Sequence, residues 1–176
     1  MFQLYNFKLP TNFRGRNAII VQLWWFVYAV FFKTSPQFLY GWRRFLLRLF
    51  GAKIGKKVII RPDCQITYPW KLEIGDYSWI GDQVVLYTLG NIKIGNNTVI
   101  SQKSYICTGT HDYSKNIFPI LAIPIEIGNS CWIATDVFIA PGIKICDEVI
   151  IGSRSSVFKS INEKGVYIGS PAKKIK

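Results

Sequence analysis

The sequence predicts an all-β protein, a parallel β-helix of about five coils with a helical arm at its N-terminus. Three observations predict it. Aliphatic residues recur every six positions through most of the chain, and glycine or another small residue often follows them. The first 50 residues lack this period and are instead rich in aromatic and basic side chains. At 176 residues, the chain can bury one sizeable core.

The N-terminal arm, residues 1–52, is basic and aromatic. Residues 1–61 contain 11 Lys or Arg and no Asp or Glu, whereas residues 62–176 contain 11 basic and 10 acidic residues. The apolar run 18–32 would rise about 22 Å as a helix, short of the roughly 30 Å of a bilayer's hydrocarbon core, which disfavours a simple span. Segment 38–50 sets three arginines among Leu and Phe, which suits a helix at an anionic interface. The arm therefore either contacts a membrane surface or packs on the β-helix or a neighbouring subunit.

The six-residue repeat occupies residues 53–162. Its aliphatic positions are Ile54, Ile60, Ile66, Ile74, Ile80, Leu86, Ile94, Ile100, Ile106, Ile127, Ile133, Ile139, Ile145, Ile151 and Val157. Three hexads make one triangular coil of about 18 residues, and stacked coils pair their short strands in parallel. Glycine directly follows six of these positions, where we expect backbone angles that residues with a β-carbon resist. Strands with a period of two would not keep this phase.

The repeat is interrupted three times. Two extra residues lie between Ile66 and Ile74, two between Leu86 and Ile94, and fifteen between Ile106 and Ile127. Insertions in a solenoid form loops on one face. The longest, placed at 112–126, directly follows His111, the only histidine, and this favours the loop as the wall of a site.

Several motifs together resemble one family. They are Gly-Thr-His-Asp-Tyr at 109–113, Pro-Ile-Glu-Ile-Gly at 124–128, Trp-Ile-Ala at 132–134, Ala-Pro-Gly at 140–142 and Gly-Ser-Pro-Ala-Lys at 169–173. The chain resembles the left-handed β-helix O-acetyltransferases, and residues 42–55 and 68–72 resemble the colanic-acid-type exopolysaccharide subgroup. The resemblance implies left-handed coiling, a homotrimer, and acetyl-coenzyme A in a groove between subunits.

His111 is the expected catalytic residue. Acetyl transfer to a hydroxyl needs the hydroxyl proton removed, because a neutral alcohol is a weak nucleophile, and an imidazole changes its protonation near neutral pH. Position 111 is also where the similar family has its catalytic histidine. Cys107 is the rival candidate, as a nucleophile that would carry the acetyl group covalently. It is disfavoured because direct transfer between the two substrates needs no covalent intermediate. Asp112, a backbone carbonyl or a more distant residue could orient the ring.

The resemblance also suggests how the two substrates are bound. A backbone N–H near Ala134 and Thr135 would stabilise the thioester oxygen, with Ser153 nearby. Lys159, Lys173 and Lys174 would meet the coenzyme's phosphates, so residues 163–176 are expected to form a coenzyme-binding tail. Tyr87, Asp112 and Tyr113 are the acceptor-side candidates, although packing is the favoured role of Tyr87. Related maltose- and galactoside-type enzymes have a substrate-binding asparagine where this chain has Gly81.

The sequence thus favours an O-acetyltransferase that moves acetyl from acetyl-coenzyme A to a hydroxyl of a sugar or polysaccharide precursor of exopolysaccharide, capsule or O-antigen type. An N-acetyltransferase acting on an amino sugar nucleotide and a non-catalytic β-helix scaffold are the alternatives. We expect no metal, because four scattered cysteines and one histidine form no ligand set, and no nucleic-acid partner, because no recognised module is present. With no evident signal peptide, we expect a cytoplasmic protein, either free or peripheral on the inner membrane.

Overall fold

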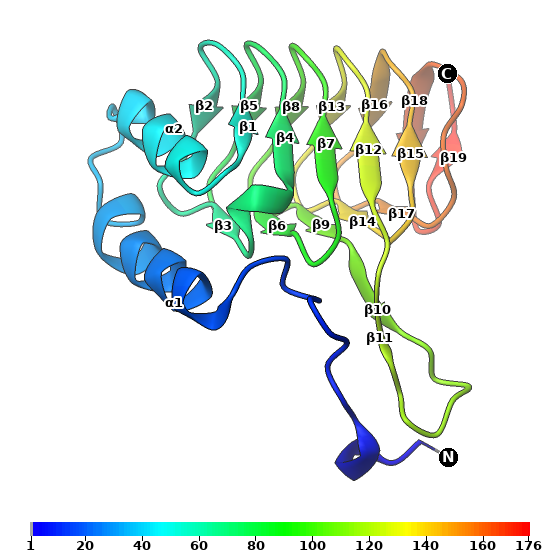
Figure 1. The fold of residues 1–176 in the computed structure, drawn as a ribbon. Helices are drawn as coiled ribbons and strands as arrows, with labels where there is room; N and C mark the ends of the chain where they lie inside the picture. The colour runs from blue at the N-terminus through cyan, green and yellow to red at the C-terminus, as the bar shows by residue number, and fades with distance from the viewer. Residues whose placement is uncertain (1) are drawn as a thin grey trace.

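The computed structural model describes residues 2–176 as a triangular prism of stacked coils, with helices at one end and a projection at one corner (Figure 1). Three parallel sheets form its sides. Sheet A consists of β1 (Lys53–Ile54), β4 (Leu72–Ile74), β7 (Ile92–Ile94), β12 (Ile125–Ile127) and β15 (Lys144–Ile145). Sheet C consists of β3 (Gln65–Ile66), β6 (Val85–Tyr87), β9 (Tyr105–Cys107), β14 (Phe138–Ile139) and β17 (Ser156–Val157).

Sheet B is the longest of the three. It consists of β2 (Ile59–Ile60), β5 (Trp79–Ile80), β8 (Val99–Ile100), β13 (Trp132–Ile133), β16 (Val149–Ile151), β18 (Gly165–Ile168) and the antiparallel β19 (Lys173–Lys174). Strand β18 pairs in parallel with β16 and adds a sixth turn to the five that the repeat predicts. The six-residue period does not predict this turn because Ile161, which pairs with Ile145, comes four residues after Val157 instead of six.

The prism's core consists of the repeat's aliphatic positions. Equivalent residues pair in register from coil to coil, as Ile60 does with Ile80 and Ile80 with Ile100. All of the predicted positions are buried, most of them completely. A strand of two or three residues buries little apolar surface by itself. The stability of the stack therefore comes from the continuous ladders of buried isoleucines. The predicted parallel β-helix is confirmed.

The repeat's glycines have a different role from the predicted one. Gly55, Gly75, Gly95 and Gly128 do not have the left-handed conformation, which instead belongs to residues two places further on, such as Tyr77 and Asn97. A β-carbon on Gly75 would lie 2.7 Å from the backbone nitrogen of Asn96 in the next coil. The glycines are therefore needed because successive coils approach closely at this corner.

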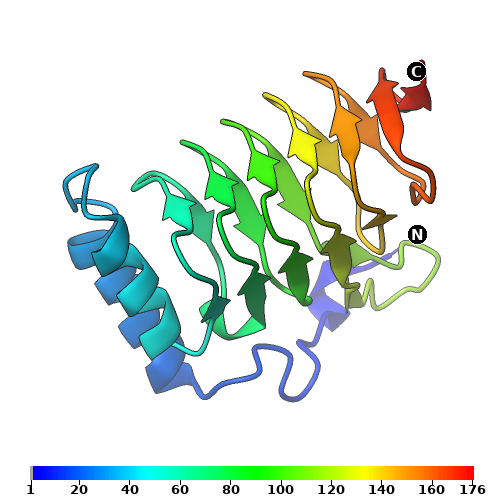
Figure 2. The ribbon, with the colours of Figure 1, turned by 90° about the horizontal axis from the view of Figure 1, so that it is seen from above.

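The N-terminal arm covers the first coil (Figure 2). It contains η1 (Leu4–Asn6), α1 (Ala18–Val27), the π-helical turn η2 (Tyr28–Phe32) and α2 (Tyr40–Leu49), while η3 (Pro69–Lys71) lies in the first insertion. The Nε1–H of buried Trp24 donates to the Ile66 carbonyl at 3.0 Å. Arg43, also fully buried, donates through Nε to the Ile60 carbonyl at 2.6 Å. One face of the arm is thus packed on the prism, and this closes an end at which core residues would meet water.

Candidate active site

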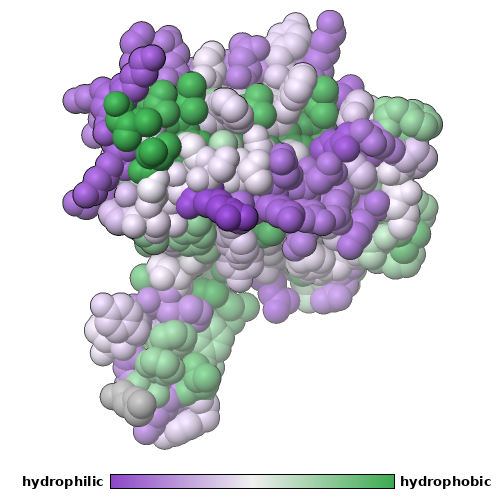
Figure 3. Space-filling model, turned by 180° about the vertical axis from the view of Figure 1, so that it is seen from behind, coloured by the Kyte–Doolittle hydropathy of each residue, from purple (hydrophilic) through white to green (hydrophobic). Residues whose placement is uncertain are grey.

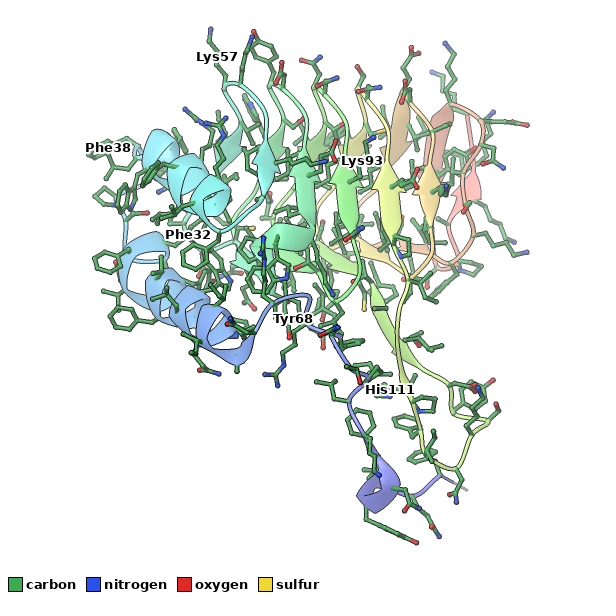
Figure 4. All side chains as sticks on the ribbon, viewed as in Figure 1. Phe32, Phe38, Lys57, Tyr68, Lys93 and His111 are labelled. Carbon is green, nitrogen blue, oxygen red and sulfur yellow. The ribbon has the colours of Figure 1, made fainter. Side chains whose placement is uncertain are left out.

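All three insertions lie at one corner of the prism, between sheet C and sheet A. The longest forms an antiparallel hairpin, β10 (Gly109–His111) and β11 (Ile120–Ala122), which projects from the corner (Figure 1). The hairpin begins three residues before the insertion placed at 112–126, and Ile125 and Glu126 already belong to β12. His111, on β10, pairs with Ile120 and is carried away from the prism's body (Figure 4).

The imidazole of His111 is held by Phe118. Its Nδ1 lies 3.0 Å from the Phe118 carbonyl oxygen, and its ring stacks on the Phe118 ring with 4.2 Å between centroids and 8° between planes. Because a carbonyl oxygen can only accept, Nδ1 carries the proton of the neutral ring and Nε2 has the free lone pair. Of the three orienting groups that the sequence leaves open, a backbone carbonyl has this position.

The first residues of the chain reach the same hairpin, which the sequence does not indicate. The N–H of Gln3 donates to the Asn116 carbonyl at 2.9 Å, and Phe2 stacks on Phe118 with 4.1 Å between centroids. The Phe7 ring lies 6.1 Å from the His111 ring. In Figure 3, hydrophobic residues on this projection lie beside hydrophilic ones. Contacts between segments so far apart in sequence have no local pattern that would predict them.

The Asp112 carboxylate bonds Ser114 and Lys115 and not the His111 ring. Its Oδ1 accepts from the Ser114 N–H at 3.1 Å and from the Ser114 hydroxyl, and its Oδ2 lies 3.6 Å from the Lys115 ammonium. These hydrogen bonds hold the pKa of the Asp112 carboxyl below its ordinary value. Tyr113, in the turn of the hairpin, is exposed. Both residues are neighbours of His111 in the sequence, but the Asp112 side chain bonds Ser114 and Lys115, and the Tyr113 side chain is in solvent.

Tyr87 and Cys107 lie at the base of the hairpin, where they pair across β6 and β9. A β-carbon on Gly109 would lie 2.9 Å from the Tyr87 ring, so Tyr87 packs directly against the strand that bears His111. The Cys107 thiol is 3.3 Å from the Gly109 carbonyl, and burial raises its pKa. A protonated thiol is a poor nucleophile, which is a further argument against Cys107.

The predicted donor-side residues lie on other parts of the prism. The Ala134 N–H donates to the Ile151 carbonyl at 2.9 Å and is therefore used by the strand ladder. Among residues 2–176, the neighbouring Thr135 N–H has no protein acceptor. Both residues follow β13, at the corner between sheets B and C, whereas His111 stands at the corner between C and A.

The remaining candidate coenzyme contacts, Ser153 and the three lysines expected at the phosphates, are exposed and lie toward the C-terminal coils. Ser153 and Lys159 flank β17, and Lys173 and Lys174 form β19. The Lys174 ammonium is 3.0 Å from Glu163, a hydrogen bond that raises its pKa. One carboxylate thus already partners one of the proposed cations. In the part of the chain that the structure describes, no His, Cys, Asp or Glu residues cluster as a metal site would require.

Known proteins with related sequence or structure include several acetyltransferases. "Putative colanic acid biosynthesis acetyltransferase WcaF" of Escherichia coli (strain K12) is 62% identical over 172 residues, which cover 98% of this chain and 94% of that protein. A maltose O-acetyltransferase from Clostridium difficile 630 superposes with a TM-score of 0.81 at 25% identity, over 91% of this chain and 88% of that one. Galactoside acetyltransferase, solved in complex with coenzyme A, gives a TM-score of 0.83 at 21% identity, over 96% and 84%.

No protein-family model matches the sequence. The identity to WcaF nevertheless extends over nearly both whole chains, and the solved structures share the left-handed coiling of this prism. The resemblance found in the repeats and motifs is thereby confirmed. The chain belongs to the hexapeptide-repeat acetyltransferases, in the group of the colanic acid biosynthesis acetyltransferase WcaF.

Proposed function

We propose that this protein transfers an acetyl group from acetyl-coenzyme A to a hydroxyl of a sugar or polysaccharide precursor, of exopolysaccharide, capsule or O-antigen type. The relatives support the class of reaction, since they include WcaF and an O-acetyltransferase of maltose. The observation that carries the mechanism is the bond between His111 Nδ1 and the Phe118 carbonyl. In the uncharged ring it leaves Nε2 unprotonated, as a base requires.

In the proposed mechanism, His111 Nε2 accepts the acceptor's hydroxyl proton while the hydroxyl oxygen forms a bond to the acetyl carbonyl carbon. The bond from that carbon to the coenzyme sulfur breaks, and the imidazolium then returns the proton to the departing sulfur. The Phe118 carbonyl accepts from Nδ1–H throughout and so stabilises the charged ring. The Thr135 N–H, which has no acceptor within residues 2–176, is the candidate donor to the thioester oxygen.

We also propose that the active enzyme is a homotrimer with coenzyme between subunits. His111 and Thr135 occupy different corners of one prism, so a neighbouring copy that brings its Thr135 corner to the hairpin would complete the site. The outer face of sheet B offers an apolar ladder for such packing: Ile59, Trp79, Val99, Trp132, Ile150 and Val166. The outer face of sheet A instead alternates Lys and Glu from coil to coil.

The trimer is tested by its mass. Light scattering of the wild type should give the mass of a trimer, and Trp79→Glu should yield monomers.

A contact of the arm with a membrane surface is the finer proposal on location. No helix among the described residues is long and apolar enough to span a bilayer. Ile19 and Phe26 on α1 and Phe45 and Leu49 on α2 are exposed. Phe38, in the turn before α2, is also exposed and points outward in Figure 4. With the basic charge of residues 1–61, this suits an interfacial helix. Vesicles containing phosphatidylglycerol should bind the protein, and high salt should release it.

The test of the proposed reaction is release of free coenzyme A thiol from acetyl-coenzyme A in the presence of sugar acceptors. Replacing His111 with Ala should lower turnover at least about 100-fold, the range for losing a general base. Ile117→Ala, an exposed change on the same hairpin, should leave turnover unchanged. Turnover of His111→Ala equal to that of the wild type would remove His111 from the role, and faster transfer to an amino sugar nucleotide than to hydroxyl acceptors would favour the N-acetyltransferase.

A further inference from the structure

A groove lined by aromatic residues runs between the N-terminal arm and the outer face of sheet C. It has a volume of about 640 Å³ and opens to solvent, and we refer to it as the aromatic groove. Five rings line it: Trp25 and Tyr28 from the arm, and Tyr68, Tyr87 and Tyr105 from the first three coils. Its volume is typical of sites for ligands larger than one sugar ring. The reaction at His111 itself does not require so large a space.

Tyr68 is buried, whereas the other four rings of the aromatic groove are at least partly exposed. Trp25 is 41% exposed, and Tyr87 and Tyr105, whose ring centroids are 6.0 Å apart, are only half-buried. Burial raises the pKa of Tyr105, and burial with nearby acidic groups raises the pKa of Tyr28 to about 12. Both phenols therefore stay protonated and can donate as well as accept hydrogen bonds. Flat rings with hydroxyl groups at their edges suit a ligand with apolar faces and a hydroxyl-bearing rim.

Polar side chains complete the lining. Gln65 and Thr67 come from the first coil and Lys33 from the arm. Gln65 is exposed, and Lys33 is 3.6 Å from Asp63, which offsets its charge. The groove therefore offers amide, hydroxyl and ammonium groups without a cluster of free cations. This combination matches a neutral polyhydroxyl ligand better than a nucleotide's phosphates, which need several cations or a run of backbone N–H groups.

One end of the aromatic groove adjoins the candidate active site. Tyr87 packs on Gly109, two residues before His111 on the extended strand β10. Two residues of a strand span about 7 Å. A sugar unit in the groove could therefore be directly linked to a unit whose hydroxyl lies at His111 Nε2. Tyr68, labelled in Figure 4, is on the same side of the prism as the base of the projection.

We propose that the aromatic groove binds the sugar units next to the one that is acetylated, so that the acceptor is an oligosaccharide and not a free monosaccharide or a sugar nucleotide. The inference rests on the proposed function and specifies its acceptor. Aromatic faces would stack on the apolar faces of the sugar rings, and Gln65 and Thr67 would bond their hydroxyls. Interactions away from the reacting hydroxyl would then position it, as remote binding energy does in enzymes generally.

The experiment compares acceptors of different length. Glucose, galactose and mannose are each supplied as the monosaccharide and as a linear trisaccharide, and kcat/KM for acetyl transfer is measured. We expect at least one trisaccharide to exceed its monosaccharide by about tenfold or more. Trp25→Ala and Gln65→Ala should each reduce that advantage, Trp25→Ala by about tenfold, because aromatic side chains that a ligand covers carry much of a site's binding energy. Phe26→Ala, next to Trp25 but outside the groove, is the matched control.

The outcomes distinguish this inference from the proposed function. The KM for acetyl-coenzyme A and the rate with monosaccharides should be the same in wild type and variants. Equal efficiency with short and long acceptors, or a length preference that survives in both Trp25→Ala and Gln65→Ala, would overturn the role of the groove while leaving sugar O-acetylation intact. Failure of the wild type to acetylate any member of the panel would instead contradict the proposed function, and the inference with it.

Discussion

The prism and the projection at its corner are built on different principles. In the prism, a buried isoleucine recurs at equivalent positions of successive coils, so each residue is supported by copies of itself above and below. The projection, which comprises the β10–β11 hairpin and residues 2–9, has no such support. It is held by two short antiparallel strands, the bond between Gln3 and Asn116, and a stack of aromatic rings around His111. Stability and chemistry are therefore located in separate parts of one chain.

The largest expected effect on stability comes from the prism. Ile100 is fully buried in β8, between the coils of β5 and β13. Ile100→Ala should lower the free energy of unfolding by about 3 kcal/mol, since the ladder leaves little room to close the cavity. Lys93→Ala, on the exposed outer face of sheet A, should cost less than about 1 kcal/mol. Urea denaturation measures both, and equal losses would contradict the ladder as the source of stability.

The projection should show the reverse pattern. Replacing Phe2 and Phe7 together with Ala removes the rings that contact Phe118 and His111. We expect kcat to fall about tenfold, because a small displacement of a catalytic group is costly, with the free energy of unfolding almost unchanged. The exposed pair Leu4 and Tyr5, replaced by Ala together, is the control. A full rate in the Phe2 and Phe7 variant would show that the N-terminal segment does not position the hairpin.

The smallest effect is expected at Asp112. Asp112→Asn keeps an oxygen that can accept from Ser114 and removes only the negative charge of the carboxylate. That carboxylate pairs with the Lys115 ammonium and not with the imidazole. The turnover number should therefore change less than about threefold, far below the loss expected for the base itself. A fall of about 100-fold would make Asp112 the group that orients His111, and the Phe118 carbonyl would lose that assignment.

The same contrast explains what the sequence can predict. The prism follows from a six-residue period that any three adjacent hexads reveal. The sixth turn does not follow from it, because Ile161 is out of phase. The repeat predicts where the glycines stand but not why they are needed, since the close approach of the next coil is a contact between coils. The flanking motif and the insertion after it predict His111 as the catalytic residue. Its partner Phe118 and the contact of Phe2 with the hairpin depend on how the projection folds back, which no local pattern encodes.

One measurement tests the central claim most directly: the tautomer of the neutral His111 ring. Because the chain contains a single histidine, 15N-labelled protein gives one pair of imidazole nitrogen signals without assignment by mutation. At a pH where the ring is uncharged, we predict a protonated Nδ1, bonded to the Phe118 carbonyl, and an unprotonated Nε2. The opposite tautomer, with the proton on Nε2, would contradict the account, because the nitrogen assigned as the base would then have no lone pair to offer.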